Sequence, residues 1–219
     1  MGNGDHMKKK STPALIGLCG KSGSGKGSVA SFFEEFGIPS VDTDAVWHEL
    51  IGPSPEDGKR SECVEALAKI FGEDAVNSDG SLNRQYVASV VFARGGKEKR
   101  GLLNRTSHPF IIEETLKRAD AFGKSGFRVV IIDAPLLFES GLDKKCDYVI
   151  AADAPDDVLI DRIVSRDGIP PERAAERIAA QKGAEELPVD LIIDTDRPRT
   201  SIREDVKRIA EILKEKYGE

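Results

Sequence analysis

A glycine-rich segment near the N-terminus has the residue types and spacing of a phosphate-binding loop. Residues 20–28 read Gly-Lys-Ser-Gly-Ser-Gly-Lys-Gly-Ser, so Gly20 to Lys26 fit the pattern G-x-x-x-x-G-K. Glycines let the backbone curl until several N–H groups converge on phosphate oxygens, and a following helix N-terminus adds its positive end. Lys26 would bring its charge to the β- and γ-phosphates of a nucleotide. The predicted phosphate-binding residues are Gly23, Ser24, Gly25, Lys26, Gly27 and Ser28.

The residue after Lys26 departs from the usual pattern, which has serine or threonine at that place. Gly27 stands there instead, and Ser28 follows one place later. This Gly-Lys-Gly-Ser ending resembles the loop of adenylate- and cytidylate-type kinases, in which the hydroxyl group is shifted in the same way. We expect Ser28 to contact either a phosphate or a magnesium ion, and the sequence leaves that choice open.

Two aspartates follow the second apolar segment of the chain. The short apolar run at residues 38–41 predicts a strand, and Asp42 and Asp44 come after it. Open α/β sheets bind ligands at the carboxyl ends of their strands, where a carboxylate can orient a hydroxyl group and accept its proton. Because residues two apart on an extended segment point the same way, we expect both side chains to face a cleft, with Asp44 the stronger candidate. Alternatively, both are solvated loop residues, or Asp42 caps the next helix.

A third aspartate, Asp133, ends residues 128–133, which we expect to form the best-buried strand of the chain. Many phosphate-loop proteins hold magnesium with an aspartate in such a position. The alternative is an ordinary aspartate at a turn before Pro135. Ser28 and Asp133 are therefore the candidate magnesium ligands.

Four arginines, Arg162, Arg166, Arg173 and Arg177, occur at four-residue spacing on two predicted helices. A planar guanidinium group grips phosphate oxygens in a bidentate way, which suits a lid that closes over a nucleotide. The alternative is surface ion pairing with neighbouring acidic residues. We expect Arg166 to act on phosphates, leave Arg162 and Arg177 open, and place Arg173 on the surface.

Two aromatic side chains, His108 and Trp47, are weaker candidates for contact with a ligand. His108 precedes Pro109 and either contacts a substrate phosphate or holds two helices together. Trp47 is the only tryptophan and lies close to Asp44 in the sequence, but core packing is the better expectation for it.

The elements that must position these residues alternate between short apolar runs and helical patterns, which predicts an α/β fold on a mostly parallel sheet. The predicted strands cover residues 14–19, 38–41, 128–133, 148–152 and 189–194. The segment 45–127 has helical periodicity and is broken by glycine and proline into short helices. Two further helices flank a turn at Asp167-Gly168, and the last helix is expected to open with the capping box Ser201-Ile-Arg-Glu204.

These elements predict one domain over residues 13–219, after a disordered, tag-like N-terminus at 1–12. Its nucleotide-binding core comprises residues 13–44, 128–154 and 188–219. A helical insertion at 45–127 would bind the substrate, and residues 155–187 would form a helical lid.

Composition narrows the class of protein. With 39% hydrophobic and 32% charged residues in 219, the chain can bury an ordinary globular core. A net charge of −6 argues against nucleic-acid or anionic-membrane binding through bulk charge. No apolar run approaches the roughly 20 residues of a membrane span. The three scattered cysteines suit a reducing compartment, so we expect a cytoplasmic protein, monomeric or weakly oligomeric, with small-molecule partners.

Several short motifs occur in the order found in the dephospho-coenzyme A kinase family, which the chain resembles from about Leu15 to its C-terminal helix. In the first part of the chain they are residues 23–26, 42–44, 48–50, 82–84, 91–92 and 108–109. In the second part they are residues 133–139, Arg162, 166–168, 177–178 and 180–181.

This resemblance implies a P-loop NTPase fold: a three-layer α/β/α sandwich with a five-stranded sheet, a helical substrate-binding insertion and a helical lid. It implies transfer of phosphate from ATP, with Mg²⁺, to the ribose 3′-hydroxyl of dephospho-coenzyme A. Asp44 would be the catalytic carboxylate, Lys26 and Arg166 would act on the phosphates, and Arg162 would support the nucleotide. The candidate substrate-binding residues are Asp42, His108, Leu136, Leu137 and Arg177.

The chain also departs from the family. The family usually has Lys-Ser-Thr in place of residues 26–28, and often an asparagine near the adenine in place of Thr195-Asp196. The alternative enzyme is a nucleoside-monophosphate kinase, although a phosphate acceptor needs no base such as Asp44. A regulatory nucleotide-binding module is the alternative of another class. The Asn-Lys-x-Asp motif of a GTP-specific switch does not occur in the sequence.

Overall fold

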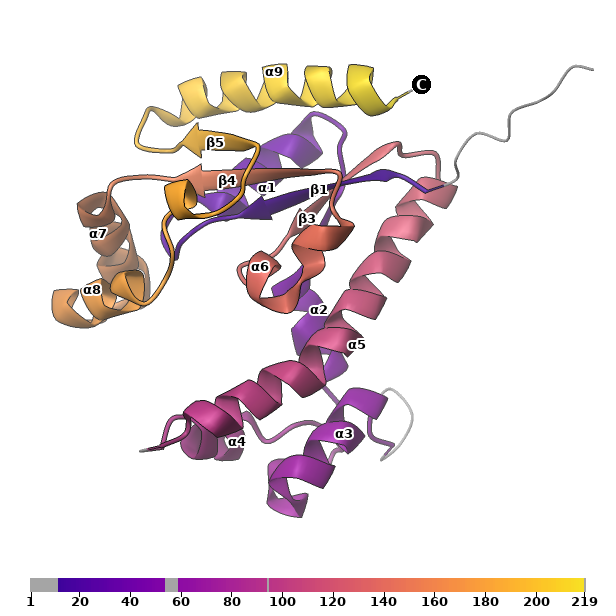
Figure 1. Ribbon diagram of the computed structural model, residues 1–219, viewed down its shortest axis with the longest axis vertical. Helices are drawn as coiled ribbons and strands as arrows, with labels where there is room; N and C mark the ends of the chain where they lie inside the picture. The colour runs from indigo at the N-terminus through magenta and orange to yellow at the C-terminus, as the bar shows by residue number, and fades with distance from the viewer. Residues whose placement is uncertain (1–11, 54–58, 94, 219) are drawn as a thin grey trace, which may run out of the picture.

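Five short apolar segments form one sheet at the centre of the computed structural model, which describes residues 12–53, 59–93 and 95–218 (Figure 1). The strands are β1 (Ala14–Cys19), β2 (Ser40–Asp42), β3 (Val129–Asp133), β4 (Tyr148–Asp153) and β5 (Leu191–Asp194). They lie in the order β2-β3-β1-β4-β5, and every pair in this sheet is parallel. The predicted α/β fold is therefore confirmed. All five strands end at the same edge of the sheet, where ligands bind in folds of this kind.

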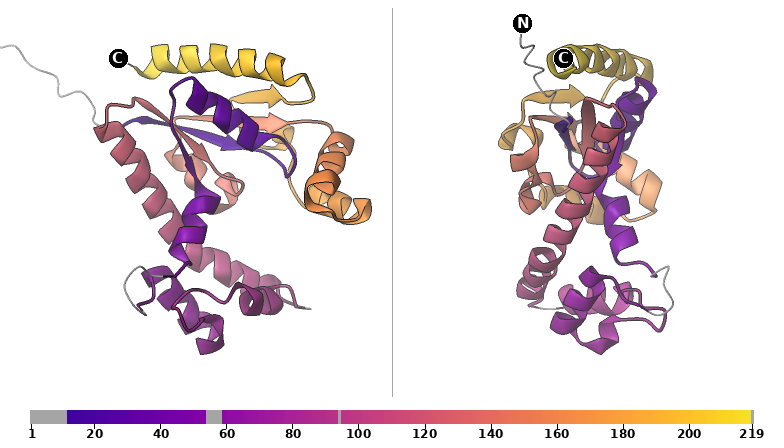
Figure 2. Two further views of the ribbon diagram at one scale, coloured as in Figure 1. Left: turned by 180° about the vertical axis from the view of Figure 1, so that it is seen from behind. Right: turned by 90° about the vertical axis from the view of Figure 1, so that its right-hand side faces the viewer.

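Helices cover both faces of the sheet, because successive strand residues point to opposite sides (Figures 1 and 2). Ile16 and Leu18 of β1 pack against α1 (Lys26–Glu35) and α9 (Arg199–Tyr217). Leu15 and Cys19 face the other side, toward α5 (Lys97–Lys124), α6 (Leu137–Ser140) and the 3-10 turn η2 (Leu142–Lys145). The result is the expected three-layer α/β/α sandwich.

The predicted insertion is helical and has a small core of its own away from the sheet (Figure 1). It consists of α2 (Thr43–Leu50), α3 (Glu62–Phe71), η1 (Glu73–Ala75), α4 (Arg84–Val91) and α5. The prediction of short helices is wrong for α5, a single 28-residue helix with Pro109 inside it. Its side chains pack into both the insertion core and the core beneath the sheet, and these contacts outweigh the hydrogen bond that proline removes. His108 therefore lies inside one continuous helix and not at a junction between two.

A helical pair stands beside the phosphate loop at the place predicted for the lid. Helix α7 (Asp156–Asp167) ends at Gly168, whose φ of +65° suits glycine, and α8 (Pro171–Ala179) begins with a proline as expected. Leu159, Ile163, Ala174 and Ile178 pack between the two helices. The turn η3 (Ala184–Glu186) then leads to β5.

Two predicted boundaries are wrong for local reasons. Helix α9 begins at Arg199 directly after Pro198, so Ser201 lies inside the helix and forms no capping box. Strand β2 ends at Asp42, and α2 starts at the next residue. Apart from Thr12, the predicted tag lies outside the described residues. No helix in the described part of the chain combines the length and apolar character of a membrane span.

Candidate active site

The glycine-rich loop connects β1 to α1 and closes tightly against its neighbours. Gly23 and Gly25 adopt φ values of +81° and +78°, which favour glycine. A Cβ atom on Gly23 would lie 2.8 Å from the Leu159 carbonyl oxygen, so a side chain would push the loop from the lid. With Asp44, Pro135, Arg162, Arg166, Arg177 and Gln181, residues 20–28 line a pocket that we call the phosphate pocket.

Lys26 is the first residue of α1, and its ammonium group donates a hydrogen bond to the Asp133 carboxylate at the end of β3. Burial raises the pKa of Asp133, and the Lys26 charge opposes that rise. Asp42 and Asp44 raise the same pKa further through their negative charges. The structure thus brings the lysine of the loop together with the carboxyl ends of β2 and β3.

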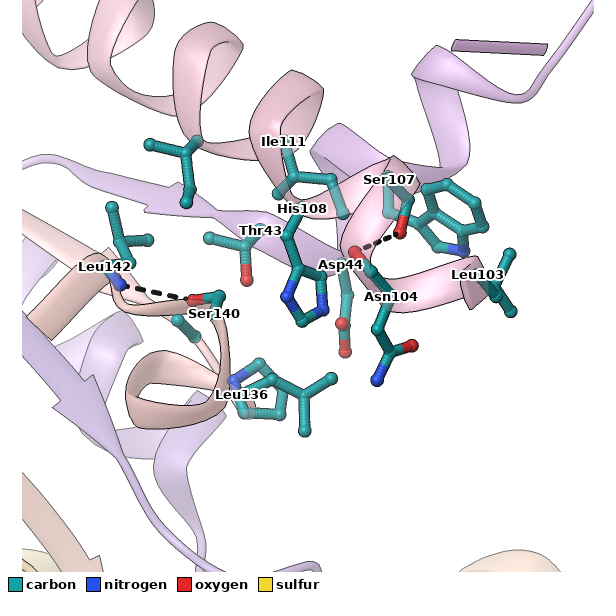
Figure 3. A pocket seen from close by; sticks show the side chains of 14 residues that line it. Thr43, Asp44, Leu103, Asn104, Ser107, His108, Ile111, Leu136, Ser140 and Leu142 are labelled. Carbon is teal, nitrogen blue, oxygen red and sulfur yellow. Dashed lines mark hydrogen bonds between the residues drawn. The ribbon is translucent and has the colours of Figure 1, made fainter. Parts of the chain in front are cut away.

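Asp44, the second residue of α2, lies where two pockets meet. It lines the phosphate pocket and also a largely apolar pocket between α2, α5 and the segment after β3, and Pro135 likewise borders both. We call this second space the apolar pocket. In Figure 3, the side chains of Asp44, His108 and Leu136 point into it. An exposed carboxylate at this junction can contact one ligand in each pocket.

Asp42, a predicted substrate-binding residue, caps a helix and lines neither of these two pockets. Its carboxylate accepts hydrogen bonds from the backbone N–H groups of Asp44 and Ala45, at 2.8 and 3.2 Å, and so caps α2. It borders a separate hollow beside Arg118 and Phe122. Asp42 and Asp44 do not point the same way because the helix, rather than an extended segment, begins between them. Capping was the alternative interpretation of this residue.

Arg166 and Arg177 reach the phosphate pocket from the two lid helices, as the lid interpretation requires. Both are bound to Asp167: Arg166 through Nε at 2.6 Å and a second nitrogen at 2.9 Å, and Arg177 through one nitrogen at 3.0 Å. The hydrogen bond from Arg166 lowers the pKa of Asp167. About half of each arginine side chain is exposed, so a phosphate group can replace Asp167 as partner. Arg173 is exposed and lies outside the pocket.

Arg162 also borders the phosphate pocket, but its guanidinium group is engaged with the protein backbone. It donates to the Gly23 carbonyl at 3.2 Å and to the Thr195 carbonyl at 2.8 Å. Ser28, in the first turn of α1, lines the same pocket, and its hydroxyl oxygen lies 3.5 Å from an Arg199 nitrogen.

The apolar pocket contains some of the predicted substrate-binding residues but not all of them. His108 and Leu136 line it, and desolvation by burial lowers the pKa of His108. Leu137 is fully buried in the core under β1, where a Cβ atom on Gly17 would lie 2.7 Å from it, so it does not reach the pocket. Leu136 and Leu137 are neighbours at the start of α6, and the helix turns one outward and the other inward.

Three residues at the site were not predicted as functional. Trp47 packs against the insertion core and also borders the apolar pocket. Gln181 accepts a hydrogen bond from the Ser22 N–H at 2.9 Å and so holds the start of the loop. Thr195 lies buried beneath the loop. Position 181 belongs to a recognised motif, but nothing in the local sequence pointed to Thr195 as a contact of the loop.

Comparison with known proteins agrees with this geometry. The family model for dephospho-CoA kinase matches residues 14–201. A dephospho-CoA kinase from Corynebacterium efficiens is 36% identical over 201 residues, covering 90% of this chain and 96% of the relative.

Solved structures show the same fold. The crystal structure of TT1252 from Thermus thermophilus superposes with a TM-score of 0.73 at 25% identity, covering 92% of this chain and 98% of that one. Dephospho-CoA kinase from Campylobacter jejuni gives a TM-score of 0.60 at 20% identity, with coverages of 92% and 97%. Sequence family and architecture agree, and the chain belongs to the dephospho-CoA kinase family.

Proposed function

We propose that this protein transfers the γ-phosphoryl group of ATP to the ribose 3′-hydroxyl of dephospho-coenzyme A, giving coenzyme A and ADP. The observation that carries the proposal is the position of Asp44 at the junction of the phosphate pocket and the apolar pocket. A kinase needs its acceptor hydroxyl in line with the terminal phosphate of the donor, and this junction is where two such ligands can meet.

On the donor side, the loop N–H groups, Lys26, Ser28 and Arg166 would hold the phosphates of ATP. Lys26 would remain close to Asp133 and turn its remaining ammonium hydrogens toward the transferring group. Arg166 would exchange Asp167 for phosphate oxygens, which its exposure permits. Arg177, on the second lid helix, would exchange the same aspartate for phosphate oxygens. These groups place positive charge where negative charge grows in the transition state.

On the acceptor side, the Asp44 carboxylate would accept a hydrogen bond from the 3′-hydroxyl and then take its proton as the new oxygen–phosphorus bond forms. ADP leaves as the bond to the γ-phosphorus breaks. His108 and Leu136 would bind the substrate within the apolar pocket. Its largely apolar lining suits the pantetheine-bearing part of dephospho-coenzyme A better than another phosphate.

The oxygen donors beside the loop fit a magnesium ion. Ser28 offers a hydroxyl in the phosphate pocket, and Asp133 offers a carboxylate next to Lys26. Mg²⁺ commonly binds through one or two such groups together with phosphates and water, so no large ligand cluster is required. Bound there, the ion would neutralise charge on the phosphates. The chain's own part is to hold Ser28 and Asp133 in place at the ends of α1 and β3.

The same proposal assigns residues 13–44, 128–154 and 188–219 to nucleotide binding, 45–127 to the acceptor, and 155–187 to the lid. The three cysteines are free thiols, which suits a reducing compartment such as the cytoplasm. We propose that the enzyme acts there on its small-molecule substrates as a monomer or weak oligomer.

An assay of ADP release across several acceptors tests the proposal directly. With ATP and magnesium, dephospho-coenzyme A should stimulate ADP release strongly, whereas AMP, CMP and adenosine should stimulate it little. Strong stimulation by AMP or CMP, and none by dephospho-coenzyme A, would show a nucleoside-monophosphate kinase instead.

Replacement of Lys26 connects that activity to the loop. Lys26→Ala removes a charge that stabilises the transferring phosphoryl group, and turnover should fall by roughly 10²-fold or more. Circular dichroism on the same sample checks that the variant is folded. Turnover close to that of the unaltered protein would show that the loop does not hold the reacting phosphates.

A further inference from the structure

Thr195 lies in the connection between β5 and α9, at the base of the phosphate loop. Its N–H, its carbonyl oxygen and its hydroxyl group all form hydrogen bonds there. It is 3% exposed. Its hydroxyl oxygen lies 2.8 Å from the Ser24 carbonyl oxygen, 2.9 Å from the Asp153 carbonyl oxygen and 3.1 Å from an Arg162 nitrogen. A hydroxyl has one proton to donate and two lone pairs to accept with, so it shares that proton between the two carbonyls in a three-centre bond and accepts from Arg162.

Its backbone is held as well. The Thr195 N–H donates to the Asp153 carbonyl at 2.8 Å, and the Thr195 carbonyl accepts from Arg162 at 2.8 Å. The phosphate loop, the end of β4 and the lid helix α7 therefore meet at this one buried residue.

The contacts bear directly on the part of the loop that must face phosphate. Arg162 binds the Gly23 carbonyl and Thr195 binds the Ser24 carbonyl, so two successive peptide groups of the loop are held. A trans peptide is planar, and its N–H points opposite to its C=O. Holding the Ser24 carbonyl thus fixes the direction of the Gly25 N–H. Gly25 has a φ of +78° and little local preference for one conformation.

We propose that Thr195 is a positioning residue for ATP: its hydroxyl, itself held by Arg162, binds the Ser24 carbonyl so that the Gly25 N–H stays aligned for the phosphates. The inference rests on the proposed function only in requiring the loop to bind ATP. We call these hydrogen bonds from Thr195 and Arg162 to the loop the tether. Arg162 belongs to α7, so it connects the tether to the lid.

Calorimetric titration with magnesium and ATP, without any acceptor, tests this role. Thr195→Val keeps the shape of the side chain and removes the hydroxyl group, leaving the Ser24 carbonyl without that partner. We expect its Kd for ATP to rise about tenfold, the scale of one or two lost buried hydrogen bonds, and KM for ATP to rise in parallel. KM for dephospho-coenzyme A should stay within about twofold.

Thr195→Ser is the matched control, since it keeps the hydroxyl group and loses only a methyl group. Its Kd for ATP should stay within about threefold of the unaltered protein. If Thr195→Val lowers Tm but binds ATP as before, or if the serine variant is impaired equally, the positioning role is wrong. Should Thr195→Val not fold, Arg162→Lys cuts the same tether, because an ammonium group cannot span Gly23 and Thr195 as a guanidinium group does.

Combining Thr195→Val with Arg162→Lys shows whether the two residues act together. If they share one tether, the double variant should bind ATP within about threefold of the weaker-binding single variant. If the losses of ATP affinity in the two single variants multiply in the double variant, the residues act independently, and the part assigned to Arg162 is wrong. The titration needs no acceptor, so a protein that binds ATP but fails to use dephospho-coenzyme A would refute the proposed function and still test this inference.

Discussion

At the level of single residues, Asp42 and Asp44 show how one helix start gives two similar side chains different surroundings. Asp42 is bound to the N-terminus of α2, whereas Asp44 is exposed between the two pockets. Each therefore has its own predicted phenotype, and the two serve as a matched pair.

Asp44→Asn keeps the shape of the side chain but removes the base. Turnover should fall by roughly 10²–10⁴-fold, the usual contribution of a positioned base, while the Kd for ATP stays within about threefold. Asp42→Asn should keep near-normal turnover, because asparagine also caps helices well. ADP release and ATP titration on both variants measure these quantities. Equal loss of turnover in the two variants would contradict the assignment of Asp44.

His108 gives a prediction in pH. Burial lowers its pKa below the ordinary value of 6.5, so the unfolded chain binds a proton more readily than the folded protein does. The stability that this residue contributes is present above about pH 6.5 and is lost as the pH falls through the lowered folded-state pKa. When the pH is lowered from about 7 to about 5, the Tm of His108→Gln should therefore fall less than the Tm of the unaltered protein. Identical pH slopes in thermal melts would contradict this.

At the level of elements, the proposed lid, α7 and α8, is the part whose side chains would exchange partners when a nucleotide binds. Arg166 and Arg177 come from different helices, and one carboxylate, Asp167, binds both across the Gly168 turn. The two helices therefore hold both arginines at the phosphate pocket, in contacts that solvent already reaches and that cost little to break.

Arg166→Lys keeps the charge and loses the bidentate fork. We expect turnover and apparent ATP affinity to weaken together, each by roughly tenfold, as is common for residues of a closing lid. Arg173→Lys, on the exposed side of α8, is the control and should change neither. An Arg166→Lys enzyme with unchanged kcat and KM would show that this arginine does not grip phosphate.

At the level of the whole molecule, separate hydrophobic clusters support the sheet and the insertion. Leu67 is fully buried among helices of the insertion, and Leu213 of α9 is buried against the sheet. The apolar pocket therefore rests in part on the insertion core, against which its lining residues Trp47 and Leu103 pack.

Leu67→Ala should cost about 2–5 kcal/mol of unfolding free energy, as buried leucine truncations do. It should also raise KM for dephospho-coenzyme A severalfold and leave KM for ATP within about twofold, because Trp47 and Leu103, which pack on this core, line the apolar pocket and not the phosphate pocket. Leu213→Ala should lower stability by a similar amount without that shift in KM for the acceptor. Denaturant unfolding and steady-state kinetics at a temperature below both melting transitions check the pair.

The amino-acid sequence by itself determined the features that depend on local spacing. The glycine pattern of residues 20–26, the alternation of apolar strands with helices, and the turn at Gly168 are short-range signals, and the structure confirms each one. Position 44 was singled out because it follows a strand of the sheet.

The tertiary structure alone decided where side chains point. Asp42 turned into a helix cap once α2 began at the next residue, and Leu137 turned into the core while Leu136 faced the pocket. Helix α5 continues past Pro109, a residue that by itself predicts a helix end, because its side chains pack into two cores. Thr195 meets Ser24 across 171 positions of sequence. Such contacts depend on how distant elements pack, and no short stretch of sequence specifies them.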